Sequence, residues 1–252
     1  MHCEATRYAA PWRVAWPARR VWRQVLQDGQ RASDLGIRMA EFDLQVPLGH
    51  YESSSYDSLD RFVSYWVQKD LILTACEEYR EPRVLEIGTG TGFLTSYLKT
   101  HGVNVVTFDF DERLQPAITG DIREIDAVIK EPYDVVSCFE VLEHIPHDHV
   151  ADVVRRLRGV TRGICVISVP QLRFYVSLWL KIPRIKPLQF YQSAPFSKRH
   201  RFDGQHYWEL GYRGYPLKGF RHLLSKHFDI DREFTNPLMP YHRFFVLRKI
   251  QE

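Results

Sequence analysis

A loop with glycine at alternate positions is the feature that most constrains the fold of this chain. Residues 83–88 read as a short buried strand, Gly90 and Gly92 follow it, and a helical pattern begins at Phe93. Glycine lets the backbone turn sharply and lets a ligand approach without a side chain between them. A strand, a glycine loop and a helix in this order predict an α/β sheet with a ligand at the carboxyl end of the strand.

The segments after the loop alternate between strand and helix patterns. Strands separated by helical stretches of this length predict βαβ units and a mainly parallel sheet. A short link rich in proline, residues 236–240, predicts that the last two strands add an antiparallel pair at one edge. The predicted strands are 83–88, 103–110, 133–140, 163–170, 229–235 and 241–250, and the predicted helices begin at residues 57, 93, 147 and 217.

The length of 252 residues favours one domain with additions over two domains. Residues 1–57 have weak periodicity and many aromatic residues, and we expect them to form an N-terminal helical cap. Residues 58–252 then form the main domain. Within it, residues 171–212 break the alternation and are expected to be a lid inserted after the fifth strand.

Composition excludes several classes of protein. The net charge of +3 does not by itself indicate a nucleic-acid partner. The four cysteines include no Cys-x-x-Cys pair, which predicts reduced thiols and neither a disulfide framework nor a zinc site. The sequence has no apolar run near the ~20 residues of a membrane span, so a cytoplasmic protein is expected.

The glycine loop does not follow the dinucleotide pattern Gly-x-Gly-x-x-Gly, because Phe93 stands where its last glycine belongs. The string Glu86-x-Gly88-x-Gly90-x-Gly92 instead resembles the first motif of the class I S-adenosylmethionine (SAM) methyltransferases. The resemblance implies a Rossmann-like fold with an antiparallel last strand and SAM as cofactor. It also implies that Glu86 meets the amino-acid end of SAM, and that the backbone of Gly88, Thr89, Gly90 and Gly92 packs along its methionyl chain.

Two further acids occupy positions that this family uses for the nucleoside. Asp109, followed by Phe110, ends the next strand and is expected to accept hydrogen bonds from the ribose hydroxyls. Asp111 is the alternative, or else it caps the short helix that follows. Asp121 and Ile122 resemble the third motif, which implies that the acid accepts from the adenine amine and that the apolar side chain packs on the ring.

Residues 134–146 resemble the fourth motif of the small-molecule branch, and most closely that of the ubiquinone-biosynthesis O-methyltransferases. The resemblance places Glu140 and Val141 at the cofactor. We expect His144 to act as the general base, because an imidazole pKa of ~6.5 suits proton transfer near neutrality, and His147, His149 and His206 are the weaker alternatives. In those relatives Glu-x-x-Glu-His is associated with a divalent metal, here Glu140, Glu143 and His144, but we expect no metal.

The same region argues against DNA as the acceptor. It contains neither the Asn/Asp-Pro-Pro-Tyr box of enzymes that methylate base amines nor the Pro-Cys nucleophile of enzymes that methylate cytosine carbon. The resemblance to the small-molecule branch implies methyl transfer to an oxygen of a small aromatic or lipid-like acceptor, with nitrogen as the second choice. The alternatives are an RNA or protein methyltransferase that uses the basic insertion, an inactive SAM-binding partner subunit, and a nicotinamide dehydrogenase.

The insertion carries an aromatic and apolar strip, residues 172–190, flanked by cations. Such a strip is typical of a lid over a flat substrate or of a peripheral contact with an anionic membrane. A helix packed at the sheet edge, with its cations in solvent, is the third interpretation.

Overall fold

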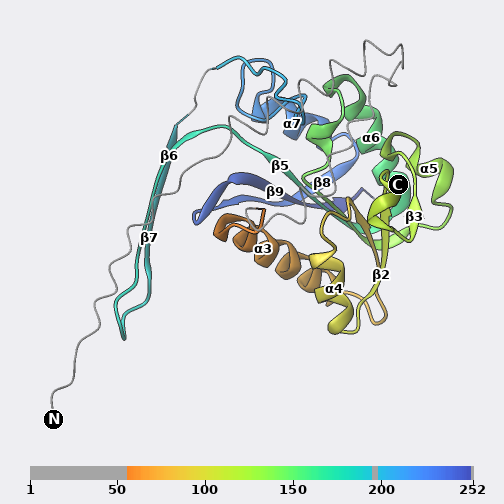
Figure 1. Ribbon diagram of the computed structural model, residues 1–252, viewed down its shortest axis with the longest axis horizontal. Coiled ribbons are helices and arrows are strands. Elements are labelled where there is room, and N and C mark those ends of the chain that lie inside the picture. The colour runs from red at the N-terminus through yellow and green to blue at the C-terminus, as the bar shows by residue number, and fades with distance from the viewer. Residues whose placement is uncertain (1–55, 195–197, 251–252) are drawn as a thin grey trace. The chain divides into compact units, whose positions relative to one another are not determined.

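A computed structural model describes residues 56–194 and 198–250 of the chain (Figure 1). The predicted cap, residues 1–57, lies almost entirely outside these ranges. The helices and 3-10 turns are α3 (Leu59–Cys76), α4 (Phe93–Thr100), η1 (Glu112–Leu114), η2 (Ile122–Glu124), α5 (Ile125–Val128), η3 (Leu142–His144), α6 (His147–Val160) and α7 (Leu217–Leu224). The strands are β1 (Arg83–Ile87), β2 (Asn104–Asp109), β3 (Ile118–Thr119), β4 (Tyr133–Phe139), β5 (Thr161–Pro170), β6 (Phe174–Leu180), β7 (Leu188–Ala194), β8 (Phe228–Asn236) and β9 (Met239–Lys249).

Seven of these strands form one sheet in the order β3-β2-β1-β4-β5-β9-β8. The pairs from β3 through β5 are parallel, and β9 is antiparallel to both β5 and β8. The predicted mainly parallel sheet with an antiparallel last strand is therefore confirmed. The strand order changes direction at β1: β2 and β3 follow on one side of it, and β4 lies on the other side. The carboxyl ends of β1, β2 and β4 therefore meet at the switch point where ligands bind in such sheets.

Helices cover the sheet on both faces, with α3 and α4 on one side and α6 and α7 on the other (Figure 1). All seven residues of β4 are buried, as expected for a central strand between two helical layers. The apolar faces of α3 and α4 close one hydrophobic cluster, and those of α5, α6 and α7 close the other. The core thus fixes the strand ends that carry the predicted motifs.

Helix α3 matches the predicted apolar spacing and begins at a capped position. The Ser58 hydroxyl accepts a hydrogen bond from the backbone N–H of Arg61 at 3.2 Å, which satisfies one donor of the first turn. Its buried side chains recur at three- and four-residue intervals, from Ser64 to Cys76, and pack on the sheet.

The strip in the insertion is a β-hairpin, so the expectation of a helix at the sheet edge is wrong. Strands β6 and β7 pair antiparallel from Phe174 opposite Ala194 to Leu180 opposite Leu188. They form a separate two-stranded ribbon that extends from the main sheet (Figure 1). β-Branched and aromatic residues favour strands over helices, and that propensity prevails here.

The far end of the inserted segment returns to the core. Trp208 is fully buried, and its indole N–H donates to the carbonyl oxygens of Leu142 and Ile145 at 3.1 and 3.2 Å. Leu210 is buried in the same cluster. Trp208 therefore anchors the insertion directly behind η3, the turn that carries His144. No helix within residues 56–194 and 198–250 has the length and apolar character needed to cross a bilayer.

Candidate active site

Three loops meet at the carboxyl ends of β1, β2 and β3. The Gly88 N–H donates to the carbonyl oxygen of Phe108 at 2.9 Å, and the Thr89 N–H donates to Oδ2 of Asp109 at 2.7 Å. The Gly120 N–H donates to the carbonyl oxygen of Asp109 at 2.9 Å. The glycine loop, the acid Asp109 that ends β2 and the third predicted motif therefore lie side by side, as the parallel topology requires.

Gly88 also places the glycine loop against the fourth motif. Its φ is +84°, and it lies so close to Val141 that an added Cβ would overlap Cγ2 of that residue. A side chain at residue 88 would therefore be strained by its backbone conformation and would collide with Val141. Gly88 and Val141, both predicted to contact the cofactor, are therefore in direct contact with each other.

Glu86 is a buried carboxylic acid below the glycine loop. It is only 4% exposed, and the Thr95 hydroxyl donates a hydrogen bond to its Oε2. Burial raises the pKa of Glu86 to about 7, although the Thr95 hydroxyl opposes this shift. The hydroxyl oxygen of Thr89 is buried nearby and has no hydrogen-bond partner among the described residues. A polar ligand along this loop would satisfy it, so the loop suits a polar cofactor.

The raised pKa of Glu86 predicts a pH-dependent stability. A folded-state pKa of about 7, against 4.5 unfolded, means that the folded protein keeps a proton that the unfolded chain releases between these values. The contribution of Glu86 to the free energy of unfolding should therefore fall by roughly 3 kcal/mol as the pH rises from about 4.5 to about 7. Glu86→Gln should remove this component in urea denaturation at pH 5 and pH 8. Equal pH dependence in both proteins would contradict the assignment.

Asp109 and Asp111 have different roles. Asp109 is 6% exposed and accepts from the N–H groups of Thr89 and Asp111, and burial raises its pKa. Asp111 caps η1 by accepting from the Arg113 N–H at 3.0 Å, and it forms an ion pair with that arginine at 2.6 Å. The capping alternative therefore holds for Asp111, and Asp109 remains the predicted ribose acceptor.

The predicted adenine residues lie after β3. Asp121 caps η2 and forms an ion pair with Arg123. Burial alone would raise the pKa of Asp121, but the side-chain and backbone hydrogen bonds from Arg123 hold it below its ordinary value. Ile122 is 6% exposed and belongs to the core, whereas Phe110 is 47% exposed. Phe110 therefore offers more apolar surface to a ring at this edge than Ile122 does.

Side chains of helix α3 bind the Glu140 carboxylate. The sequence motifs did not predict this contact. Glu140 Oε2 accepts from Arg61 at 2.8 Å, and its Oε1 accepts from the Ser64 hydroxyl at 3.0 Å and from the Gln68 amide at 3.1 Å. His242 Nδ1 of β9 lies 3.1 Å from the same Oε1. Residues 61, 64 and 68 share one face of a helix, and a polar stripe on an otherwise apolar face was the available signal.

Glu143 and His144 lie on η3 and face the end of the insertion. Glu143 is 1% exposed, and burial raises its pKa to about 8. His144 Nδ1 lies 3.1 Å from the carbonyl oxygen of Gln205. Burial and the neighbouring His206 lower the pKa of His144 to about 4, so its imidazole is neutral near pH 7 but is a weaker base than the ordinary imidazole that the sequence analysis assumed. Since a carbonyl only accepts, Nδ1 carries the proton and Nε2 keeps a lone pair.

His206, from the inserted segment, packs against His144. Its ring centroid is 5.0 Å from that of His144. His206 Nδ1 lies 2.8 Å from Oε1 of Glu209, which also accepts from the Tyr241 hydroxyl at 2.8 Å. Burial would lower the pKa of His206, but the carboxylates of Glu209 and Glu143 hold it above its ordinary value. Sequence distance hid this arrangement, because residues 144, 206 and 241 lie on three separate segments.

The predicted metal-ligand alternative does not form as the sequence motif suggests. The Glu140 carboxylate is bound by Arg61, Ser64 and Gln68 of α3 and lies beside His242 of β9. Among the described residues, groups of three that bring one ligating atom each within 4.8 Å are Glu143, His144 and His206, and Asp203, His206 and Glu209. Glu140 belongs to neither, so the set of Glu140, Glu143 and His144 does not fit one ion.

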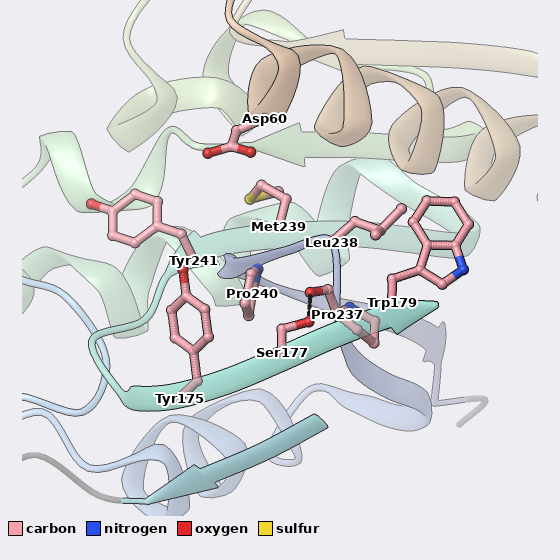
Figure 2. A pocket seen from close by; sticks show the side chains of 9 residues that line it. All are labelled: Asp60, Tyr175, Ser177, Trp179, Pro237, Leu238, Met239, Pro240 and Tyr241. Atoms are coloured by element: carbon pink, nitrogen blue, oxygen red, sulfur yellow. Dashed lines mark hydrogen bonds between the residues drawn. The ribbon is translucent and has the colours of Figure 1, made fainter. Parts of the chain in front are cut away.

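A pocket of about 260 Å³ opens between the hairpin, the start of α3 and the turn from β8 to β9 (Figure 2). Tyr175 and Trp179 from β6 form one wall, and Asp60 is the charged group in its lining. Tyr241 connects this pocket to Glu209 and His206, since its hydroxyl donates to Glu209. The remaining lining residues are Ser177, Pro237, Leu238, Met239 and Pro240.

The sheet order, the antiparallel β9 between β5 and β8, and the glycine loop after β1 define a Rossmann-like class I methyltransferase fold. A family model described as "Methyltransferase domain" matches residues 59–216. The match covers more than half of the chain, which therefore belongs to this family of methyltransferases.

Curated relatives match a shorter part of the chain. The ubiquinone biosynthesis O-methyltransferase of Pseudomonas aeruginosa is 33% identical over 87 residues, which are 29% of this chain and 37% of that protein. A ribosomal RNA small subunit methyltransferase A of Streptococcus pneumoniae is 32% identical over 74 residues, 29% of this chain and 25% of that protein. The chain thus spans between a quarter and little more than a third of the length of these relatives, whose names indicate different acceptors.

Solved structures match the fold over longer ranges. A SAM-dependent methyltransferase from Clostridium acetobutylicum has a TM-score of 0.54 at 13% identity, over 78% of this chain and 96% of that chain. The 1,6-didemethyltoxoflavin-N1-methyltransferase of Burkholderia thailandensis has a TM-score of 0.52 at 16% identity, over 100% and 99% of the two chains. These matches confirm the fold that the sequence predicted.

Proposed function

We propose that this methyltransferase transfers the methyl group of SAM to an oxygen of a small aromatic or lipid-like acceptor, with nitrogen as the second choice. The observation that carries the proposal is the contact of the glycine loop with Val141, next to η3. A cofactor along that loop lies beside a turn that presents a neutral imidazole, His144. A hydroxyl acceptor must lose its proton during methyl transfer, and a positioned imidazole serves that purpose.

The cofactor is held by residues of three loops. The backbone of residues 88–92 and the acid Glu86 serve its methionyl part, and Asp109 serves its ribose. Phe110, Asp121 and Ile122 contact its adenine. Glu140 and Val141, which follow β4, lie next to the glycine loop. The methyl group of SAM is on a sulfonium, which is already an activated leaving group. The protein therefore has to hold the acceptor oxygen in line at about 3–3.5 Å and to remove the proton of a hydroxyl acceptor.

The pocket of Figure 2 is the proposed acceptor site. Its walls from Tyr175 and Trp179 suit a flat ring. Tyr241 in its lining leads through Glu209 and His206 to His144.

Incubation with labelled SAM and a native extract of small metabolites tests this function. Mass spectrometry should find one small molecule that gains a methyl group on oxygen. Label on RNA or protein, with binding that falls steeply as salt rises, would instead support the macromolecular alternative. SAM binding without turnover on any fraction would support an inactive partner subunit.

The hairpin supports a proposed contact with an anionic membrane surface. Side chains alternate between faces along a strand, so Phe174, Val176, Leu178 and Leu180 share one face of β6. The register sets Phe190 and Leu188 of β7 on the same face. All six are exposed, and the opposite face contributes to the pocket. We call these six residues the outer apolar face.

Charge makes an anionic surface the favoured partner. Lys181, Arg184 and Lys186 lie at the tip of the hairpin, next to exposed Ile182 and Ile185. The stretch 153–202 contains no Asp or Glu. Exposed apolar side chains beside cations suit an interface of anionic lipid, where each cation contributes about 1 kcal/mol. A cytoplasmic location is part of this proposal, and the unpaired buried thiols of Cys76, Cys138 and Cys165 support it.

Vesicle binding tests this contact. Replacing Lys181, Arg184 and Lys186 together by Gln should weaken binding to phosphatidylglycerol vesicles by roughly 3 kcal/mol, or about 100-fold. The pair Lys130→Gln and Lys226→Gln, away from the hairpin, is the control and should change binding little. Equal binding to phosphatidylcholine and phosphatidylglycerol, no binding to either, or an unchanged triple variant would contradict the proposal.

A further inference from the structure

We propose that Arg173, Tyr191 and Arg243 bind a phosphate monoester group near the base of the hairpin, where β6 and β7 leave the main sheet. Arg173 immediately precedes β6, Tyr191 lies on β7, and Arg243 lies on β9. The proposed function uses none of these three residues. The inference therefore goes beyond it, because binding of a phosphate here requires no assumption about the atom that is methylated.

The strand register places the three side chains on facing surfaces. Arg173 and Ser177 fall on one face of β6, and Tyr191 lies opposite Ser177 on β7. Ser177 lines the pocket beside the turn from β8 to β9 (Figure 2). Tyr241 of β9 lines the same pocket, and Arg243, two residues further, shares its face of the strand. Both Arg173 and Tyr191 lie within electrostatic reach of Arg243, so the cluster adjoins the pocket.

Donor groups in this cluster are buried without an acceptor. Nε of Arg173 and the hydroxyl of Tyr191 are both buried, and neither has a hydrogen-bond partner among the described residues. Within the same part of the chain, Arg243 donates only through Nε, to Oε1 of Glu233 at 2.7 Å, although its side chain is just 11% exposed. Buried polar groups are normally hydrogen-bonded, because a donor without a partner keeps the cost of losing its water. The oxygens of one ligand would satisfy these donors together.

Positive charge is in excess at the same place. Glu233 accepts from two nitrogens of Arg221 and from Nε of Arg243, so both of its oxygens are engaged. It balances one of the three positive charges of Arg173, Arg221 and Arg243. Burial lowers the pKa of Arg243; the attraction of Glu233 opposes this shift, and repulsion from Arg173 and Arg221 adds to it. An anion beside Arg173 and Arg243 would relieve the repulsion.

This donor set suits a phosphate monoester better than a small anion with one charge. Two guanidinium groups and a phenol hydroxyl supply donors from three segments, and a phosphate monoester has three strong acceptor oxygens. Its charge of about −1.5 to −2 near pH 7 matches the positive charge that Glu233 leaves unbalanced. The planar fork of arginine donates paired N–H groups to phosphate oxygens. The phosphate belongs either to a lipid headgroup at the hairpin or to a soluble molecule that enters the neighbouring pocket.

Calorimetric titration of the full chain with glycerol 3-phosphate, at constant ionic strength, tests the inference. Wild type should bind one molecule per chain and should not bind glycerol, which lacks the phosphate. Arg173→Gln and Tyr191→Phe should each weaken binding by about 10-fold or more, as expected when a hydrogen bond to a charged group is lost. Circular dichroism checks folding. Tyr191→Phe removes only a hydroxyl, so it remains informative if Arg173→Gln misfolds.

Arg201→Gln is the matched control, because Arg201 is an exposed arginine of the same insertion, and it should bind glycerol 3-phosphate like wild type. The inference is wrong if wild type binds glycerol 3-phosphate no better than glycerol, if Arg173→Gln and Tyr191→Phe bind like wild type, or if Arg201→Gln loses as much affinity as they do. These readouts are independent of turnover, so a failure to find a methylated product would leave them intact.

Vesicles containing phosphatidic acid distinguish the two sources of the phosphate. If Tyr191→Phe weakens binding to these vesicles as it weakens binding of glycerol 3-phosphate, the site takes a lipid phosphate. If only the binding of glycerol 3-phosphate falls, the site takes the phosphate of a soluble molecule.

Discussion

Replacing His144 by alanine is expected to slow methyl transfer by about 10²- to 10⁴-fold and to leave SAM affinity within a few-fold of wild type. In the proposed function the acceptor hydroxyl loses its proton beside this side chain, and a positioned base contributes a factor of this size. His144 lies on η3, outside the glycine loop, so the cofactor contacts remain. Single-turnover kinetics with labelled SAM, combined with calorimetry of SAM binding, separate the two effects.

His149→Ala is the control for this prediction. His149 is exposed on the first turn of α6, a few residues from His144 in sequence. Its replacement should leave turnover near wild type. A His144→Ala enzyme with wild-type turnover would move the proton acceptor elsewhere, and a parallel loss of SAM affinity would indicate that His144 supports the cofactor instead.

Replacing Asp109 by alanine is expected to weaken SAM binding by about 100-fold. The variant loses the buried carboxylate that is proposed to accept from the ribose, and hydrogen bonds to charged groups contribute about 1.5–3 kcal/mol. It also loses the acceptor that holds the N–H of Thr89 at 2.7 Å, so the glycine loop becomes less ordered. Isothermal calorimetry with SAM and with S-adenosylhomocysteine measures the change.

Asp111→Ala is the matched control, because Asp111 is an acid two residues away that caps η1 and pairs with Arg113. Its effect on SAM affinity should stay below about threefold, although the protein should lose up to about 1 kcal/mol of stability with the cap. If Asp111→Ala weakens SAM as much as Asp109→Ala does, the ribose acceptor has been assigned to the wrong acid.

The sequence predicted those parts of the fold that depend on local patterns. The glycine loop after β1 is set by spacing, and the buried strands β4 and β5 are set by continuous apolar runs. The antiparallel pair β8 and β9 followed from a short proline-containing link. In each case the residues that determine the element lie within it or next to it, so a single sequence carries the signal.

The parts that escaped prediction depend on distant residues. Glu140 is held by Arg61 and Ser64 of α3 and by His242 of β9, and only the folded sheet brings these elements to one strand end. The cluster of His144 with His206 likewise requires the insertion to return through Trp208 to η3. Spacing along the chain contains no measure of such distances.

Calorimetry of the wild-type protein with SAM tests the central claim most directly, namely that SAM binds along the glycine loop between Glu86 and Asp109. The account predicts one site per chain for SAM and for S-adenosylhomocysteine, and no heat of binding with NAD. Binding of NAD together with no response to SAM or S-adenosylhomocysteine would contradict it.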